Sequence, residues 1–374
     1  MIMRNVYLYF IGISLVVFGC KERQLNTNVL SAIDTIVYHK PVDTLCSQYV
    51  SKITYLQLKN SDNHMLHDVT KIKSSKDKIY IFSKKMHKLS VYTKNGAFVY
   101  EIDQQGKGYK EYMETANFTI DDKYIYILDN VKNQVVLFDM QTGLFVKKIA
   151  IPFIAWDMEY LCDGRFLFTC IPNNPAGKLS KKQPNGAVWE TDSTFNKVQR
   201  LYFPYHDDYY EMVGKDVYFT KSEDKVIFHS FQMQGFYMFK KEKYAPEYVD
   251  LTFDKPLPIN GKVNYSEVSE NGYQFLAGTP VVLNSYIVLS VAESGYDEPV
   301  LYNRITRKIS KNPEVDSYNN ILYPLFVVDN KYVYYLADYD FYNMLVSSGF
   351  KRAEVETETL LENGGACLLF YEMK

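Results

Sequence analysis

A two-strand pattern with its connecting turns occurs twice in this chain and returns near the C-terminus. The first copy spans residues 77–99 and the second spans residues 122–146. Tyr80 of the first copy corresponds to Tyr126 of the second. The opening strand of the pattern returns at residues 329–338. The period of about 46 residues is the size of one four-stranded propeller blade. The repeat therefore predicts an all-β chain folded as a β-propeller.

Strand signals continue through the rest of the chain. Short aromatic and β-branched runs alternate with turn dipeptides such as Asn95-Gly96, as expected for consecutive hairpins. Many runs, including residues 124–128 and 333–336, are apolar on both alternating faces, which is typical of strands covered on both sides. Each blade of a propeller lies between two others, so this pattern supports the same fold. Six blades are expected, at residues 64–103, 113–151, 154–203, 210–253, 273–309 and 325–371.

One strand, at residues 53–58, is left over ahead of the first blade. A ring must close, because an exposed sheet edge invites pairing with other chains. We therefore expect this N-terminal strand to join the last blade and close the six-bladed ring. A further short strand is expected at residues 34–38, and residues 354–362 are predicted to form either a short helix or a charged loop.

The first residues have the pattern of an export signal. Arg4 precedes an apolar run at residues 6–18, which is too short to span a bilayer comfortably. The run ends in Gly19 before Cys20, which resembles the lipobox of bacterial lipoproteins. That resemblance implies cleavage before Cys20 and acylation of this cysteine, so that the lipid attaches the protein to a membrane. An ordinary secretory signal with an incidental cysteine is the alternative. The expected domains are a lipoprotein signal peptide at 1–19, a tether at 20–49 and the propeller at 50–374.

The residues after Cys20 and the overall charge bear on location and partners. Lys21-Glu22-Arg23 loosely resembles the surface-export signals of Bacteroidetes lipoproteins. An outer-membrane lipoprotein of the cell envelope is therefore expected, with outward display somewhat favoured over a periplasmic position. The formal net charge is −2, with acids and bases interspersed. Without a basic face to neutralise phosphates, a nucleic-acid partner is not expected.

The cysteines within the expected propeller do not form a metal or disulfide motif. A tight turn at Asp163-Gly164 pairs Cys162 with Arg165, which leaves Cys170 too far along the neighbouring strand to bridge Cys162. We therefore expect Cys162 and Cys170 to be free thiols. No Cys-x-x-Cys or His/Cys cluster indicates zinc, so no metal site and no cofactor is predicted.

A family resemblance rests on the leading strand, the first hairpin and the loop that follows it. In six-bladed β-propeller lipoproteins of Bacteroidetes, which are relatives of the NHL-repeat propellers, this loop commonly reads Gly-x-Gly-Pro-Gly-Glu-Tyr. The chain keeps four of these positions, as Gly106, Gly108, Glu111 and Tyr112. It departs from the pattern at Tyr109 and Lys110. The resemblance implies the fold and the envelope location, and it carries over no catalytic residue.

Polar and aromatic residues gather in three stretches between the predicted strands. The densest stretch, residues 205–210, could present carboxylates, a histidine and stacking rings to a saccharide or a cation. Neighbouring carboxylates in sequence point in different directions, so a paired acid/base role is not implied. A solvated loop between blades is the alternative. The candidate ligand-binding residues are His206, Asp207, Asp208, Tyr209, Tyr296 and Asp340.

Two other motifs favour structural interpretations. Gly106-Lys107-Gly108 has the glycines of a phosphate-binding loop, but no helix is expected after it. His64 and His67 have a spacing that does not place two imidazoles on one face of a strand. We interpret the glycine motif as a turn between blades and the two histidines as polar residues on the surface.

No motif for a catalytic residue is present, since the chain lacks the Gly-x-Ser-x-Gly elbow of many hydrolases. The sequence therefore favours a lipid-anchored, non-enzymatic propeller that binds a ligand or a protein in the cell envelope. One alternative is an envelope enzyme that processes glycans or peptides, which rests on analogy of fold alone. Another is an accessory subunit of an outer-membrane uptake complex.

Overall fold

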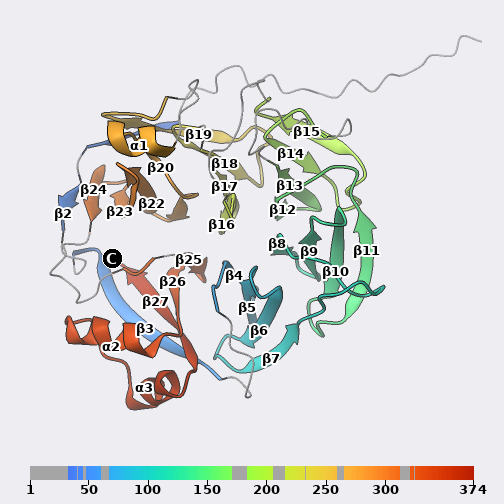
Figure 1. Ribbon diagram of the computed structural model, residues 1–374, viewed down its shortest axis with the longest axis horizontal. Helices are drawn as coiled ribbons and strands as arrows, with labels where there is room; N and C mark the ends of the chain where they lie inside the picture. Colours follow the sequence, from blue (N-terminus) through green and yellow to red (C-terminus); the bar gives the residue numbers. More distant parts are fainter. Residues whose placement is uncertain are drawn as a thin grey trace, which may run out of the picture.

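The structure is a computed structural model of the chain, and its described strands form six sheets around a central axis (Figure 1). Each sheet is one blade of a propeller, which confirms the predicted fold class. The described residues are 33–39, 41–44, 48–59, 67–170, 183–204, 215–231, 233–258, 265–311, 321–323 and 325–374.

The six blades follow the chain in order. Blade 1 contains β4 (Lys71–Ser74), β5 (Lys78–Ser83), β6 (Lys88–Thr93) and β7 (Phe98–Ile102). Blade 2 contains β8 (Asn117–Ile120), β9 (Tyr124–Asp129), β10 (Gln134–Asp139) and β11 (Phe145–Ala150). Blade 3 contains β12 (Asp157–Cys162), β13 (Arg165–Thr169), β14 (Val188–Thr191) and β15 (Val198–Tyr202).

The second half of the ring follows the same plan with additions. Blade 4 contains β16 (Phe219–Ser222), β17 (Lys225–Phe228), β18 (Phe236–Lys240) and β19 (Glu247–Phe253). Blade 5 contains β20 (Gln274–Leu276), β21 (Val281–Leu283), β22 (Tyr286–Glu293), β23 (Tyr296–Asn303) and β24 (Lys308–Lys311). Blade 6 contains β25 (Phe326–Val328), β26 (Lys331–Leu336), β27 (Ala366–Met373) and β3 (Val50–Leu58).

The repeated glycines of the sequence pattern lie at equivalent turns. Gly96 connects β6 to β7, and Gly143 connects β10 to β11, with φ angles of +82° and +69°. A glycine adopts this left-handed conformation without the strain that a Cβ would cause. At Gly96 an added Cβ would also lie 1.9 Å from the carbonyl oxygen of Gln57 on β3. The repeat therefore marks turns that need glycine for both conformation and space.

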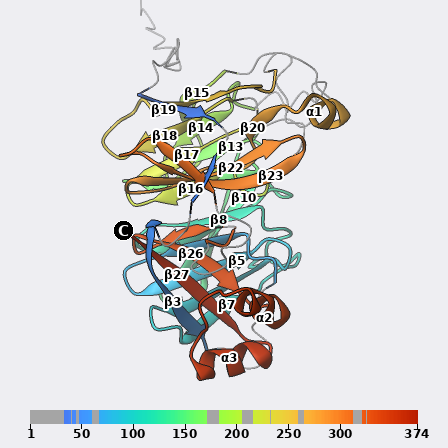
Figure 2. The same ribbon diagram turned by 90° about the vertical axis from the view of Figure 1, so that its left-hand side faces the viewer.

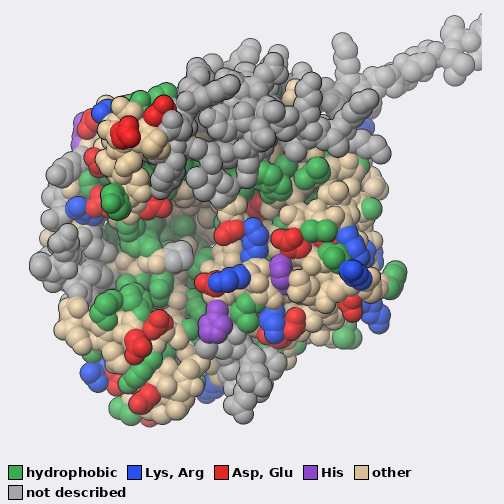
Figure 3. All heavy atoms as spheres, viewed as in Figure 1, with side chains coloured by type: hydrophobic (Ala, Val, Ile, Leu, Met, Phe, Trp, Pro, Cys, Tyr) green, Lys and Arg blue, Asp and Glu red, His purple; other side chains and the backbone are tan. Residues whose placement is uncertain are grey.

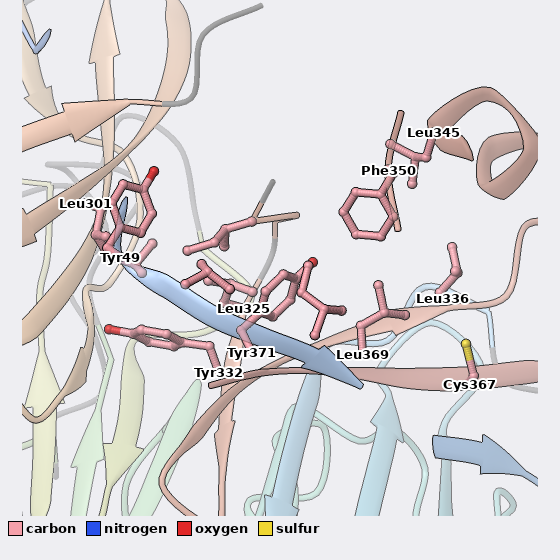
Figure 4. Close-up of a cluster of buried hydrophobic side chains, with 14 of the residues drawn as sticks. Tyr49, Leu301, Leu325, Tyr332, Leu336, Leu345, Phe350, Cys367, Leu369 and Tyr371 are labelled. Carbon is pink, nitrogen blue, oxygen red and sulfur yellow. The ribbon is translucent and has the colours of Figure 1, made fainter. Parts of the chain in front are cut away.

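The ring closes as expected, because β3 pairs antiparallel with β27. The register runs from Leu58 opposite Ala366 to Val50 opposite Met373. One face of this pair contributes to a hydrophobic cluster that also contains Tyr332 and reaches Leu301 of blade 5 (Figure 4). The N-terminal strand β3 and the C-terminal strand β27 are therefore joined by hydrogen bonds and by a shared hydrophobic core.

Two strands of the expected tether join the propeller. The predicted strand at 34–38 is present as β1 (Asp34–Tyr38), and it pairs in parallel with β19 at the edge of blade 4. The two-residue strand β2 (Val42–Asp43) pairs in parallel with β24 of blade 5. The side chains of Ile36 and Tyr38 are buried. This stretch of chain therefore covers the outer edges of two neighbouring blades.

In the part of the chain that the structure describes, three helices interrupt the strands. They are α1 (Tyr265–Asn271), α2 (Tyr339–Ser347) and α3 (Val355–Glu362). The helical alternative for residues 354–362 is confirmed by α3. The stretch around Asp340, for which a solvated loop was the alternative to a binding site, forms α2 rather than a loop. Asp338 begins α2 by accepting a hydrogen bond from the Phe341 amide, as an N-cap does. Among the described residues, no helix is long and apolar enough to cross a membrane.

The helices distinguish the two faces of the ring. Figure 2 shows α1 and α2 on the same side of the propeller, with the C-terminus toward the other side. We call the side with α1 and α2 the helical face. The segment that contains α2 and α3 connects the second and third strands of blade 6. The corresponding hairpin of blade 1, between β5 and β6, therefore reaches the same face.

The cysteine prediction is confirmed. Cys162 pairs in register with Arg165, and Cys162 and Cys170 are both free and buried. Burial raises the pKa of the Cys170 thiol to about 12. Both thiols are therefore packing groups rather than reactive ones.

Candidate functional site

A cavity of about 2020 Å³ occupies the axis of the propeller. The hollow is visible on the helical face (Figure 3). Its lining comes from inner strands of the ring, including β4 and β16, and from residues of α2 on the helical face. Cavities of this kind, where loops and strand ends converge, are the usual position of ligand sites on a rigid scaffold.

Blade 6 gives the cavity an aromatic wall. Tyr334 and Tyr335 of β26 line it together with Tyr339 and Phe341 of α2. These four side chains are half-buried, so each is partly exposed. Aromatic side chains offer large, rigid contact surfaces at low entropic cost, which suits them to binding.

Tyr339 is held in place by its neighbour on the same helix. Its ring stacks on Tyr342, with the centroids 6.2 Å apart and the planes 20° from parallel. The Tyr342 hydroxyl donates to Glu358 Oε1 at 2.5 Å and accepts from the Ala353 amide at 3.0 Å. Tyr342 is buried, so the chain fixes the surface on which Tyr339 rests.

Opposite charges meet where the cavity opens between blades 1 and 4. Lys84, which follows β5, lies 2.7 Å from the Asp216 carboxylate, which precedes β16. Lys85 lies 2.8 Å from Asp68. All four residues line the cavity, and both pairs are substantially exposed. Each pair balances its own charge, so the mouth has little net preference for an anion or a cation at this side.

Deeper along the axis lies a group of charges that we call the neck, which is buried except for Lys221, a half-buried residue. It consists of Lys71 and Lys73 on β4, Asp157 and Glu159 on β12, and Lys221 on β16. The side chains of the two acids are fully buried, and those of Lys71 and Lys73 are 5% and 8% exposed. The three lysines line the cavity.

Glu159 is the centre of the neck. Its Oε1 and Oε2 accept hydrogen bonds from Lys73 Nζ at 2.6 and 2.7 Å. Its Oε2 also lies 3.1 Å from Lys71 Nζ, and its Oε1 accepts from the Thr119 hydroxyl at 2.6 Å. The surrounding ammonium groups overcome the cost of burial and lower the pKa of Glu159 to about 2.

Asp157 is held by the backbone of the next blade. Its Oδ2 accepts from the amides of Tyr218 and Phe219 at 2.8 and 2.9 Å. Its Oδ1 accepts from the Met158 amide at 2.7 Å and lies 3.7 Å from Lys71 Nζ. Burial raises the pKa of Asp157, and Lys71 and the donating amides oppose this effect. Asp157 therefore joins blade 3 to blade 4 at the axis.

The lysines of the neck are unequally compensated. Lys221 Nζ donates to the carbonyl of Tyr160 at 2.7 Å and lies over its ring, 5.0 Å from the centroid. Burial, together with the positive charges of Lys71 and Lys221, outweighs Glu159 and lowers the pKa of Lys73 to about 7. Burial also lowers the pKa of Lys221. The neck therefore holds more ammonium groups than it can readily keep charged.

The structure places the candidate ligand-binding residues differently relative to the axial cavity. Asp340 lies on α2 and lines the cavity. Tyr296 is 81% exposed at the start of β23 and is not among the lining residues. The other four candidates, His206, Asp207, Asp208 and Tyr209, lie outside the described residues. Whether any of the six binds a ligand stays a prediction.

Sequence reasoning missed the neck. Its signal was present, because Lys71-Ile72-Lys73 and Asp157-Met158-Glu159 place charges at alternate positions of otherwise apolar strands. Alternate residues point to one face of a strand. Two such patterns of opposite charge could have been paired, although their partners lie 86 residues apart in the chain.

The motifs interpreted as structural fit that interpretation where they are described. The Gly108 amide donates to the Glu111 carboxylate at 2.7 Å, so the loop supplies its own anion. His67 is exposed at the cavity mouth. Within the described ranges, no group of three or more His, Cys, Asp or Glu residues is placed to hold a metal ion.

The solved structure of a similar protein agrees with this fold. An inferred exported protein of Bacteroides fragilis matches with a TM-score of 0.75 at 18% identity, over 91% of this chain and 99% of that one. A member of the DUF4221 family from Bacteroides vulgatus matches with a TM-score of 0.49 at 10% identity, over 87% of this chain and 97% of that one. A search of curated proteins found no match. One family model, described as "Domain of unknown function (DUF4934)", matches residues 30–363. The chain therefore belongs to the DUF4934 family and is a six-bladed propeller of that family.

Proposed function

We propose that this protein is a lipid-anchored binding module of the cell envelope that holds a ligand in its axial cavity without transforming it. The observation that carries the proposal is the cavity itself, with an aromatic wall from blade 6 and charged groups from blades 1 and 4. Aromatic surfaces with a few polar groups at their edges are what small-molecule sites require. The closed ring keeps these groups in fixed positions, which reduces the entropic cost of binding.

The envelope location is supported by two separate observations. The apolar run before Cys20 has the length and ending of a lipoprotein signal. The structurally similar Bacteroides fragilis protein is inferred to be exported. We infer that the mature chain begins at Cys20 and is attached to the outer membrane by lipid, and that it is displayed outward. Envelope glycans and peptides are then the ligands within reach.

A binding screen tests the proposal. The soluble mature chain, residues 20–374 with Cys20→Ser, would be applied to arrays of envelope glycans and short peptides. We expect at least one class of compound to bind saturably and to be recovered unchanged. Recovery of cleaved product would favour the enzymatic alternative, and a lack of saturable binding across both arrays would count against a binding module.

Replacing Tyr339 with alanine is expected to weaken binding of the ligand found in this screen by roughly fivefold. The stacked ring offers a fixed aromatic surface, and aromatic contacts of this kind contribute on the order of 1 kcal/mol, where 1.4 kcal/mol is about tenfold. Isothermal titration would measure the dissociation constant. Tyr109→Ala is the matched control, since Tyr109 is 80% exposed, makes an edge-to-face contact with Phe145 and does not line the cavity. Equal losses in both variants would contradict a site in the cavity.

Replacing Cys20 with alanine is expected to release the protein from the membrane fraction. Acylation requires the cysteine thiol, and without lipid the remaining chain has only the uncleaved apolar run to hold it. Cell fractionation and metabolic labelling with radioactive palmitate would measure both effects. Cys367→Ala is the control, because Cys367 is a free cysteine buried in blade 6. Unchanged fractionation and labelling of Cys20→Ala would remove the anchor from the proposal.

A further inference from the structure

The neck has more positive groups than negative ones. Three ammonium groups, from Lys71, Lys73 and Lys221, face the two carboxylates of Asp157 and Glu159. All three lysines line the axial cavity, whereas neither acid does. A ligand that enters the cavity would therefore meet lysine side chains at the neck, with the carboxylates behind them.

The two carboxylates have little capacity left for further donors. Glu159 already accepts from Lys73 and Thr119 and lies against Lys71. Asp157 accepts three backbone amides. An ammonium group has three N–H donors, and the acceptor of Lys221 is a single backbone carbonyl, that of Tyr160. The lysines can therefore donate more hydrogen bonds than these acids can accept.

An unbalanced buried charge is costly unless a partner compensates it. Besides Glu159, the carboxylate whose charge acts on Lys221 is that of Asp122, which is exposed in the turn between β8 and β9. The exposed pair of Lys84 and Asp216 is already balanced. The excess charge is relieved either by loss of the proton of Lys73 or by an anion from outside this set of residues.

We propose that the neck binds an anionic oxygen group, as found in a phosphate, a sulfate or a carboxylate, that belongs to the ligand of the axial cavity. This inference rests on the proposed function and names the chemistry of the ligand. Lys73 and Lys221 supply the N–H donors, and Lys71 holds the carboxylates behind them. The rest of the ligand extends toward the aromatic wall of blade 6.

Binding is coupled to a proton at Lys73. In the free protein the pKa of Lys73 is lowered to about 7 by burial, Lys71 and Lys221, against the opposing effect of Glu159. An anion beside this amine favours its charged form and raises its pKa. The affinity for the anion is therefore highest below pH 7 and falls as the pH rises above 7. Within the neck Asp157 acts on Lys71, and outside the neck Asp122, beside β8, acts on Lys221.

Calorimetric titration of the soluble mature chain with inorganic phosphate tests the inference. We expect one site. Its affinity for sulfate, whose own charge does not change in this range, should decrease by roughly tenfold between pH 6 and pH 8. We also expect Lys221→Met to weaken this site by about tenfold, because it removes a charged donor. Lys243→Met is the matched control, since Lys243 is 57% exposed, pairs with Glu247 and does not line the cavity. Titration with sulfate and with acetate would show which oxygen group the neck prefers.

Lys73→Met is a second variant with a readout that does not depend on affinity. In wild type, NMR of lysine ammonium groups should show one amine that titrates near pH 7 and whose pKa rises when phosphate is added. The signal should be absent from Lys73→Met.

The inference is overturned if phosphate binds Lys221→Met and wild type equally, or if no oxyanion binds. If oxyanions bind at the neck but the arrays reveal no ligand, the proposed function fails and the anion site stands. If array ligands bind but oxyanions do not, the proposed function stands and the anion site at the neck fails.

Discussion

Replacing Glu159 with alanine is expected to lower the free energy of unfolding by about 3–5 kcal/mol, the range found when one partner of a buried ion pair is removed. The substitution leaves Lys73 without the carboxylate that accepts both of its hydrogen bonds. It also leaves Lys71 with Asp157 as its remaining acid at the neck, 3.7 Å away. Urea unfolding of the soluble mature chain, followed by circular dichroism, would measure the change.

Two variants separate the loss of charge compensation from a general effect of substitution. Glu298→Ala breaks a partly exposed pair with Lys311, and pairs of this kind contribute about 0–1 kcal/mol. The double variant Lys73→Met/Glu159→Met removes both charges together, so it is expected to be more stable than Glu159→Ala alone. If the double variant loses as much stability as the sum of its single variants, the two side chains are not coupled and the description of the neck is wrong.

The depressed pKa of Glu159 also sets a pH dependence. The folded-state pKa is about 2, below its ordinary value of 4.5. A carboxyl with a lowered folded pKa contributes stability that is present above its unfolded pKa and is lost as the pH falls toward the folded pKa. Wild type should therefore lose this contribution between about pH 5 and pH 2, and Glu159→Gln should not.

Removing β3 is the second change with a large expected effect. A chain that begins at residue 60 lacks four buried side chains of the closing segment, Tyr49, Val50, Ile53 and Leu58. Each such side chain contributes about 1.5–3 kcal/mol when buried. Their sum is comparable to the whole stability of a typical domain, about 5–15 kcal/mol. The truncation also exposes the edge of β27 along the register that it shares with β3.

We therefore expect the chain that begins at residue 60 to lose its cooperative unfolding transition, as measured by scanning calorimetry. A chain that begins at residue 45 is the matched control. It lacks β1 and β2 but keeps β3, so its ring stays closed. It should retain one transition, at a lower temperature. Equal stability of the two truncated chains would show that β3 does not close the ring.

The propeller was predictable because its signals are local and repeated. Aromatic runs separated by turn residues give strands, and the glycines at Gly96 and Gly143 mark equivalent positions in successive blades. The closing strand could be inferred because one strand was left over and a ring cannot leave an edge unpaired. The parallel pairing of β1 with β19 was not predicted, because the two strands are more than two hundred residues apart and no turn connects them.

The candidate site was less predictable, for a different physical reason. Local density of polar and aromatic residues led to Asp340, which lines the cavity, and to Tyr296, which does not. The neck depends on which inner strands face one another across the axis, and that is set by the closure of the whole ring. Lys73 and Glu159 come from different blades, and each is one of two alternate charges in its strand whose partner is not apparent until the blades are placed.

A crystal structure of the soluble mature chain with the ligand that binds tightest in the array screen is the decisive measurement. We predict that the ligand lies in the axial cavity against Tyr339, with an anionic oxygen group within hydrogen-bonding distance of Lys73 and Lys221. A ligand bound instead to the outer strands of the blades, or to the face opposite α1 and α2, would contradict the proposal that this propeller binds through its axial cavity.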